Sequence, residues 1–169
     1  MNVELSTPRL FIKSLDLSDA PLIYNLLNTD GWKKFIGDKN IQSTEDAANY
    51  ISKILENKNY HYFVFSSKEA KAPLGLITFL FRDTQDSPDL GFAILPQYEG
   101  FGYAYEAAQR VLEFAKEKFN PKKIIAILYP ENSKSINLLT RLNFKFQETF
   151  IEGDLTLARY LYNPSSFLS

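Results

Sequence analysis

A segment in the second half of the chain carries residue types that can hold a phosphate-bearing ligand. Gly100 and Gly102 stand one residue apart, directly before a helix predicted over about 102–118. Two glycines so placed let the backbone turn tightly and approach a ligand without Cβ atoms in the way. The first turn of a helix has unpaired N–H groups and a partial positive charge, so the amides of about Gly100 to Ala104 can hold a pyrophosphate. A plain strand-to-helix turn uses the same glycines, and the glycines alone favour that second interpretation.

Two common phosphate sites do not match this segment. A P-loop ends in Gly-Lys-Ser/Thr, and that ending is absent here. A dinucleotide-binding fingerprint needs three glycines at fixed spacing and an acidic residue at the end of the next strand, and both are missing.

Composition removes several other kinds of site. The 169 residues contain no cysteine, which excludes disulfides, a cysteine-based zinc site and a cysteine nucleophile. His61 is the only histidine and lies in an aromatic strand, so we expect it to pack there and we expect no metal site. A net charge of −1 gives no general attraction to nucleic acid or to anionic membranes. No signal peptide and no apolar run of the roughly 18 residues that a membrane span needs is found, so we expect no membrane association and a cytoplasmic location.

The order of the apolar patterns predicts one domain over residues 1–169. We expect strands at 9–15, 60–66, 74–82, 89–95, 123–128, 144–150 and 155–162. We expect helices at 18–27 (with stop signals at Asn28 and Gly31), from Ser43 onward, at 102–118 and at 133–142. Three strands followed by two helix crossovers predict an α+β fold, in which a mixed sheet has helices on both faces. The loop 96–102 then lies at the carboxyl end of a central strand, where open sheets bind ligands.

Three segments, in order along the chain, resemble the RimJ/RimL-type branch of the GNAT acyltransferase superfamily. Residues 7–10 (TPRL) are similar to the first strand of that branch. Gln97-x-x-Gly100-x-Gly102 resembles the family's acetyl-CoA motif, Arg/Gln-x-x-Gly-x-Gly/Ala, at a strand-to-helix junction. Residues 130–144 are similar to an Asn-x-x-Ser, apolar helix, Gly-Phe signature. The resemblance covers nearly the whole chain and implies a mixed, mostly antiparallel sheet of about seven strands flanked by about four helices.

The resemblance also implies which residues bind acetyl-CoA, the expected co-substrate. Backbone groups near the end of the central strand would bind the pantetheine arm, because the adjacent parallel strands splay apart there in similar proteins. The loop and the start of the helix would bind the pyrophosphate, and Asn132 would bind the pantetheine or cap its own helix; we favour the first role, since Ser133 can serve as the cap. The complete set of expected cofactor-binding residues is Phe92, Ile94, Leu95, Gln97, Gly100, Phe101, Gly102, Tyr103, Ala104 and Asn132.

Three positions depart from the family pattern. Phe101 stands where many relatives have Lys or Arg, so phosphate binding must rest mainly on backbone amides. Asn143 replaces the usual glycine before Phe144, and asparagine also tolerates the left-handed cap conformation. Leu139 stands where many relatives have a tyrosine proton donor, so a general acid must come from elsewhere.

Catalysis would then fall to few candidates. Ser135 matches a position proposed in RimL-like enzymes to protonate the leaving thiolate, and a local backbone hydrogen bond is an equally good interpretation. Asp89 is the first candidate for a general base, although a solvent-facing charge at the strand end is the favoured interpretation; Asp83, Asp86 and Glu148 are weaker candidates.

The function predicted is N-acetyl transfer from acetyl-CoA to a primary amine, either a protein N-terminus or a small amine. A catalytically silent acyl-CoA-binding module for sensing or assembly is the alternative, because the loop cation and the helix tyrosine are missing. Acidic residues near the expected acceptor entrance, Asp30, Asp38 and Asp154, favour a cationic amine weakly. Trp32 can line that entrance, although packing between helices is the favoured interpretation. Monomer and homodimer are both compatible with the sequence.

Overall fold

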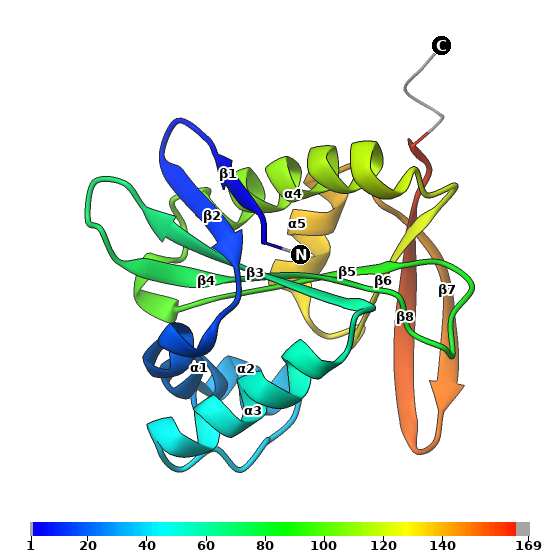
Figure 1. The fold of residues 1–169 in the computed structure, drawn as a ribbon. Coiled ribbons are helices and arrows are strands. Elements are labelled where there is room, and N and C mark those ends of the chain that lie inside the picture. The colour runs from blue at the N-terminus through cyan, green and yellow to red at the C-terminus, as the bar shows by residue number, and fades with distance from the viewer. Residues whose placement is uncertain (1, 165–169) are drawn as a thin grey trace.

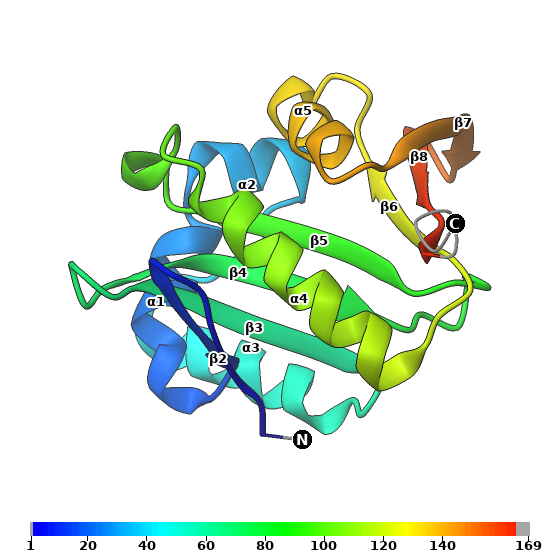
Figure 2. The same cartoon turned by 90° about the horizontal axis from the view of Figure 1, so that it is seen from above.

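In residues 2–164, which the computed structural model describes, the apolar patterns form one eight-stranded sheet with helices on both faces (Figures 1 and 2). The strands are β1 (Glu4–Ser6), β2 (Leu10–Ser14), β3 (Tyr60–Ser67), β4 (Pro73–Leu80), β5 (Asp89–Ile94), β6 (Ile124–Leu128), β7 (Lys145–Glu152) and β8 (Leu155–Tyr162). The α-helices are α1 (Ala20–Leu27), α2 (Asp30–Phe35), α3 (Thr44–Glu56), α4 (Tyr103–Phe119) and α5 (Ser133–Arg141). Two short 3-10 helices, η1 (Leu17–Asp19) and η2 (Pro96–Tyr98), complete the described elements.

The sheet is antiparallel except at one pair of neighbouring strands. Its order is β1-β2-β3-β4-β5-β6-β8-β7, and β5 and β6, which α4 connects, are parallel. The predicted α+β fold with a mixed, mostly antiparallel sheet is therefore confirmed. The described part of the chain has eight strands where about seven are expected, and five α-helices where about four are expected.

The two extra elements are short ones that apolar patterns do not predict. β1 has three residues and pairs with β2. α2 has six residues and starts where the sequence predicts a stop, because the Thr29 hydroxyl accepts a hydrogen bond from the Trp32 N–H at 3.2 Å and caps a new helix.

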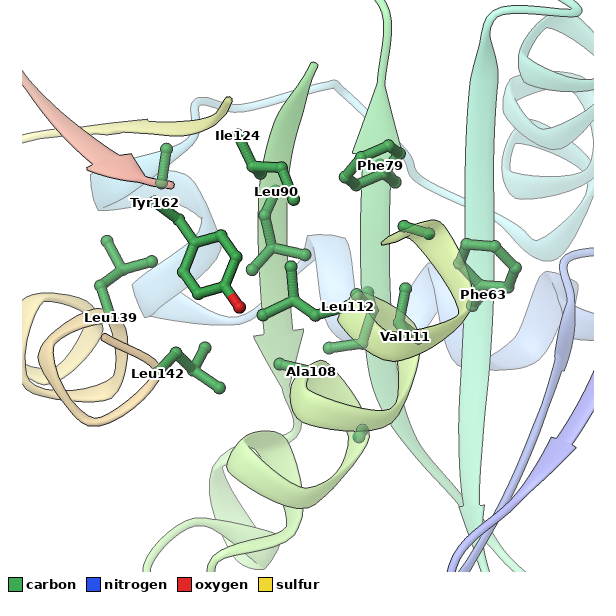
Figure 3. Packing of buried hydrophobic residues seen from close by; sticks show 14 of the residues in the cluster. Phe63, Phe79, Leu90, Ala108, Val111, Leu112, Ile124, Leu139, Leu142 and Tyr162 are labelled. Atoms are coloured by element: carbon green, nitrogen blue, oxygen red, sulfur yellow. The ribbon is translucent and has the colours of Figure 1, made fainter. Parts of the chain in front are cut away.

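Alternation along the strands sends side chains into two cores, one on each face of the sheet. Helices α4 and α5 cover one core, which includes Phe79, Leu90, Val111 and Leu139 (Figure 3). Helices α1, α2 and α3 cover the other face, where Figure 1 shows them below the sheet. No helix in residues 2–164 is both long enough and apolar enough to cross a membrane.

Strands β5 and β6 stay together only at one end. Their ladder consists of one pair, Asp89 with Ile125, whereas β4 and β5 pair along the whole of β5. Beyond that pair β5 and β6 diverge, which opens the middle of the sheet toward the start of α4.

Candidate active site

The two glycines before α4 have the left-handed conformation that their type allows. Gly100 has a φ of 87° and Gly102 a φ of 81°. Gly102 is the residue that precedes the first turn of α4, and no side chain caps that turn. The amides of Tyr103 and Ala104 therefore begin the helix without a side-chain acceptor, an arrangement suited to an anion.

An arginine from the start of the chain braces this loop from outside. The Arg9 guanidinium donates to the Phe101 carbonyl at 2.8 Å and to the Glu106 carboxylate at 2.8 Å, and it lies 4.4 Å from the centre of the Tyr103 ring. A Cβ atom added at Gly102 would stand 3.4 Å from Arg9 Nη2. Arg9 thus places a cation beside the loop although Phe101 occupies the usual position of one.

Sequence reasoning missed this role of Arg9. The only signal was its place in the TPRL segment, which is more than 90 residues away from the loop. Phe101 itself is 61% exposed, and Gln97 is exposed within η2.

The backbone of β5 presents alternate amides to the opened side of the sheet. The Pro88 carbonyl accepts from the Ile125 N–H at 2.9 Å. Because backbone groups alternate in direction along a strand, every second residue after Pro88, including Phe92 and Ile94, also directs its N–H and C=O toward β6. β6 has diverged there, so these two amides fit the expected role. Leu95 does not, because its N–H donates to the Leu74 carbonyl and its carbonyl accepts from the Tyr98 N–H. The expectation that Leu95 offers a free amide is corrected for that reason.

A cavity of about 330 Å³ passes through the opening between the strands. On the α5 side its lining includes Tyr129, Asn132 and Ser135. On the other side it reaches α2 and α3, and its lining there includes the paired strand residues Thr78 and Gly91. A Cβ atom at Gly91 would lie 2.5 Å from Thr78 Oγ1, so this position has no room for a side chain.

Comparison with known proteins identifies the family. The profile of the acetyltransferase (GNAT) domain matches residues 9–145. The chain belongs to the GNAT acetyltransferase family. It is therefore an acetyl-CoA-dependent acyltransferase, as the TPRL, glycine-loop and Asn-x-x-Ser segments together predict.

Individual relatives are distant in sequence and close in fold. An uncharacterized N-acetyltransferase, YnaD of Bacillus subtilis, is 26% identical over 95% of both chains. The ribosomal L7/L12 α-N-protein acetyltransferase RimL, solved with coenzyme A, superposes with a TM-score of 0.83 at 11% identity, over 95% of this chain and 98% of that one. Spermidine N-acetyltransferase of Vibrio cholerae, solved with CoA and spermine, has a TM-score of 0.80 at 21% identity, over 96% and 100% of the two chains.

Within this acetyltransferase, Asp89 supplies the one carboxylate among the described residues of the cavity lining. It is 6% exposed and lines the cavity, so the favoured expectation of a solvent-facing charge is wrong. Arg82 Nε donates to Asp89 Oδ2 at 2.7 Å. Burial raises the pKa of the Asp89 carboxyl above its usual value, more than the Arg82 guanidinium lowers it. The weaker candidates Asp83, Asp86 and Glu148 do not line the cavity, and Glu148 pairs with Arg159.

At the start of α5, the side chains of Asn132 and Ser135 differ in their hydrogen bonding. The Asn132 side-chain oxygen accepts from the Ser135 N–H at 3.4 Å and is the cap of the helix. The expectation that Ser133 is the cap is therefore wrong, since Ser133 is already the first helical residue. Within residues 2–164 the Ser135 hydroxyl has no hydrogen-bond partner, and it lines the cavity. One turn on, the buried Leu139 closes the wall where many family members have a tyrosine.

The far end of the cavity is aromatic. Trp32 both packs in the core under α1–α3 and lines the cavity, and its indole Nε1 is buried without a partner in the described residues. The hydroxyls of Tyr50 and Tyr62 share a hydrogen bond there. His61 is packed as expected, against Phe81 and Phe119, outside this cavity.

The lining does not support the expected acidic entrance. Asp30, Asp38 and Asp154 are exposed, and none of them lines the cavity. Residues 2–164 contain no cluster of three or more His, Asp or Glu side chains that is suited to hold a metal ion.

Proposed function

We propose that this enzyme transfers the acetyl group of acetyl-CoA to a primary amine that binds at the α2–α3 end of the cavity. The observation that carries the proposal is the single-pair ladder between β5 and β6, because the resulting opening joins the two faces of the sheet. Acetyl-CoA supplies an activated acetyl group. The residues present fit it, since a glycine loop, an uncapped helix start and two strand amides lie along one edge of the opening.

Each side of the opening has its own task. The amides of Gly100 to Ala104 bind the pyrophosphate, and Gln97 and Phe101 flank it. The amides of Phe92 and Ile94 bind the pantetheine arm and hold the thioester beside the gap. Positioning of this kind removes much of the entropic cost of bringing two substrates together.

Two side chains move protons in this proposal. Asp89, on the acceptor side of β5, takes a proton from the ammonium of the bound amine, directly or through water. Ser135, with its hydroxyl available on the α5 side, gives a proton to the thiolate sulfur as the C–S bond breaks, and its oxygen takes up the second proton that the newly acetylated nitrogen loses. Arg82 keeps Asp89 oriented by its hydrogen bond.

Binding and turnover measured separately test the proposal. We expect CoA to raise the melting temperature, since a ligand at about 100 times its Kd stabilises by about 2.7 kcal/mol. We also expect free thiol release when an amine panel is added with acetyl-CoA. Stabilisation by CoA without thiol release from any amine would favour the silent binding module instead.

The pH dependence tests Asp89. A base works only when deprotonated, so kcat/KM should fall as the pH drops through the Asp89 pKa. Because burial raises that pKa, the fall should begin above the ordinary aspartate range near about 3.9. Asp89→Asn should remove this limb and lower kcat by about 10²–10⁴-fold.

Asp83→Asn is the matched control, since Asp83 is exposed in the loop before β5 and lies outside the cavity. If Asp89→Asn is folded, as its melting curve would show, and its kcat/KM still falls at low pH as in the wild type, Asp89 is not the general base.

A further inference from the structure

The charged groups at the acceptor end point to a particular class of amine. We infer that the acceptor carries a carboxylate as well as its amine, and that Arg82 and Lys39 bind the carboxylate. This inference rests on the proposed function and narrows its substrate.

The cavity lining holds two cations and one carboxylate. Lys39 follows α2, Arg82 follows β4, and Asp89 opens β5. Asp89 is the one carboxylate among the described residues of the lining, and it already pairs with Arg82. The acceptor end therefore has a net positive charge. Asp89 is needed for the amine that reacts, so no carboxylate remains to pair with a second ammonium group of the acceptor.

Arg82 has donors to spare. Its Nε is taken by Asp89 at 2.7 Å, and its Nη groups have no hydrogen-bond partner in residues 2–164. A guanidinium presents five donors in a planar fork that matches a carboxylate. The side chain is 48% exposed and belongs to the cavity lining, so a ligand can reach it.

A polycation fits this end poorly. Each ammonium taken from water needs a partner, because a buried charge without one is strongly unfavourable. Aromatic faces of Trp32 and Tyr62 can attract a cation, but Lys39 and Arg82 repel it from the same walls. Neither Asp30, the first residue of α2, nor Asp38, which follows that helix, lines the cavity.

The walls of the acceptor end also favour an acceptor with an apolar or aromatic side chain. Trp32, Phe35, Tyr50 and Tyr62 surround the acceptor end. The unpartnered Trp32 Nε1 is a donor that lacks an acceptor, and a carbonyl or carboxylate oxygen is the group that satisfies it. The class inferred is thus a small amino acid or short peptide with an apolar side chain.

Binding to the CoA-saturated protein tests the inference independently of turnover. Calorimetry would compare L-phenylalanine and L-leucine with their carboxamides, with spermidine as a polycation. We expect each amino acid to bind at least about tenfold more tightly than its carboxamide, which is the range for a hydrogen-bonded charge pair. Equal binding of acid and amide, tighter binding of spermidine, or no binding of any amino acid would overturn the inference.

Two variants locate the carboxylate site. Arg82→Gln and Lys39→Gln should each reduce the preference for acid over amide, and the ratio cancels any effect of Arg82→Gln on Asp89. Lys33→Gln is the control, since Lys33 is an exposed lysine of α2 outside the cavity. A preference that survives both variants would overturn the assignment. Thiol release from acetyl-CoA, measured with the same variants in separate samples that contain no free CoA, reports on the proposed function, which can fail while carboxylate binding is retained.

Discussion

Helices α4 and α5 both begin beside the opening in the sheet, and their first turns are built in opposite ways. At α5 the Asn132 oxygen accepts from the Ser135 N–H and closes the turn. At α4 the preceding residue is Gly102, with a φ of 81° and no side-chain cap. A helix start that satisfies its own amides has little to offer an anion, whereas an open one binds it with several N–H groups. We therefore propose that the pyrophosphate binds at the start of α4 and that α5 contributes side chains instead.

Leaving a helix start open has a structural cost, and Arg9 offsets part of it. The guanidinium holds the Phe101 carbonyl and the Glu106 carboxylate together, and Thr7 Oγ1 donates to the same carboxylate. Burial tends to raise the pKa of the Glu106 carboxyl, but the hydrogen bonds from Thr7 and Arg9 lower it overall. The open turn is thus fixed from its outer side, while its inner amides remain available.

Distorting the uncapped first turn of α4 should have the largest effect on CoA binding. Gly102→Val places a β-branched side chain at a positive φ, which costs at least about 1–2 kcal/mol, and its Cβ approaches Arg9 Nη2. We expect the Kd for CoA, measured by calorimetry, to rise by about tenfold or more.

Phe101→Ala is the matched control one residue away. Phe101 binds Arg9 through its backbone carbonyl, and its side chain is 61% exposed, so truncation should change the Kd by less than about threefold. An equal loss of affinity in both variants would show that the Phe101 ring, and not the turn, carries the binding.

Removing the outer brace should weaken CoA binding by a smaller factor. Arg9→Ala breaks the contacts with Phe101 and Glu106 but leaves the glycine conformations possible, so we expect a rise in Kd of about three- to tenfold. The Glu106 pKa should rise in this variant, because one of the groups that lower it is gone.

A double-mutant cycle with Glu106→Gln distinguishes a brace from a direct phosphate contact. Non-additive losses indicate that Arg9 acts through Glu106. Additive losses with a steeper salt dependence in the wild type would assign Arg9 to the phosphate instead.

The same contrast explains which parts of the site the sequence could predict. The α4 turn is determined locally: Gly100 and Gly102 lie next to the helix that they start, so their conformation follows from residue type. The order of strands was predictable for a similar reason, since each strand has its own apolar pattern. Short elements such as β1 and α2 were missed because few residues carry their signal.

Contacts between distant segments were not predictable. The brace joins Arg9 to Phe101 across 92 positions, and the burial of Asp89 depends on how β5 meets β6 and Arg82. Likewise, the sequence does not show that the Leu95 N–H donates to the Leu74 carbonyl, because this hydrogen bond depends on the register of β4 and β5. The residue types at the site could therefore be predicted from the sequence, but which of their polar groups are free to bind a ligand could not.

Opening the closed turn should have the smallest effect on CoA binding. Asn132→Ala removes the cap of α5 and should lower the free energy of unfolding by about 1 kcal/mol, measured by denaturant titration. Asn132→Asp retains an oxygen to cap the helix and loses the amide donor, so it should keep most of the stability. Because Asn132 also lines the cavity, its Nδ2 can still bind the pantetheine; a CoA Kd that rises in both variants, with stability lost only in the alanine variant, assigns that contact. If neither variant changes the Kd, the side chain serves α5 alone, and the two helix starts divide anion binding and scaffolding completely between them.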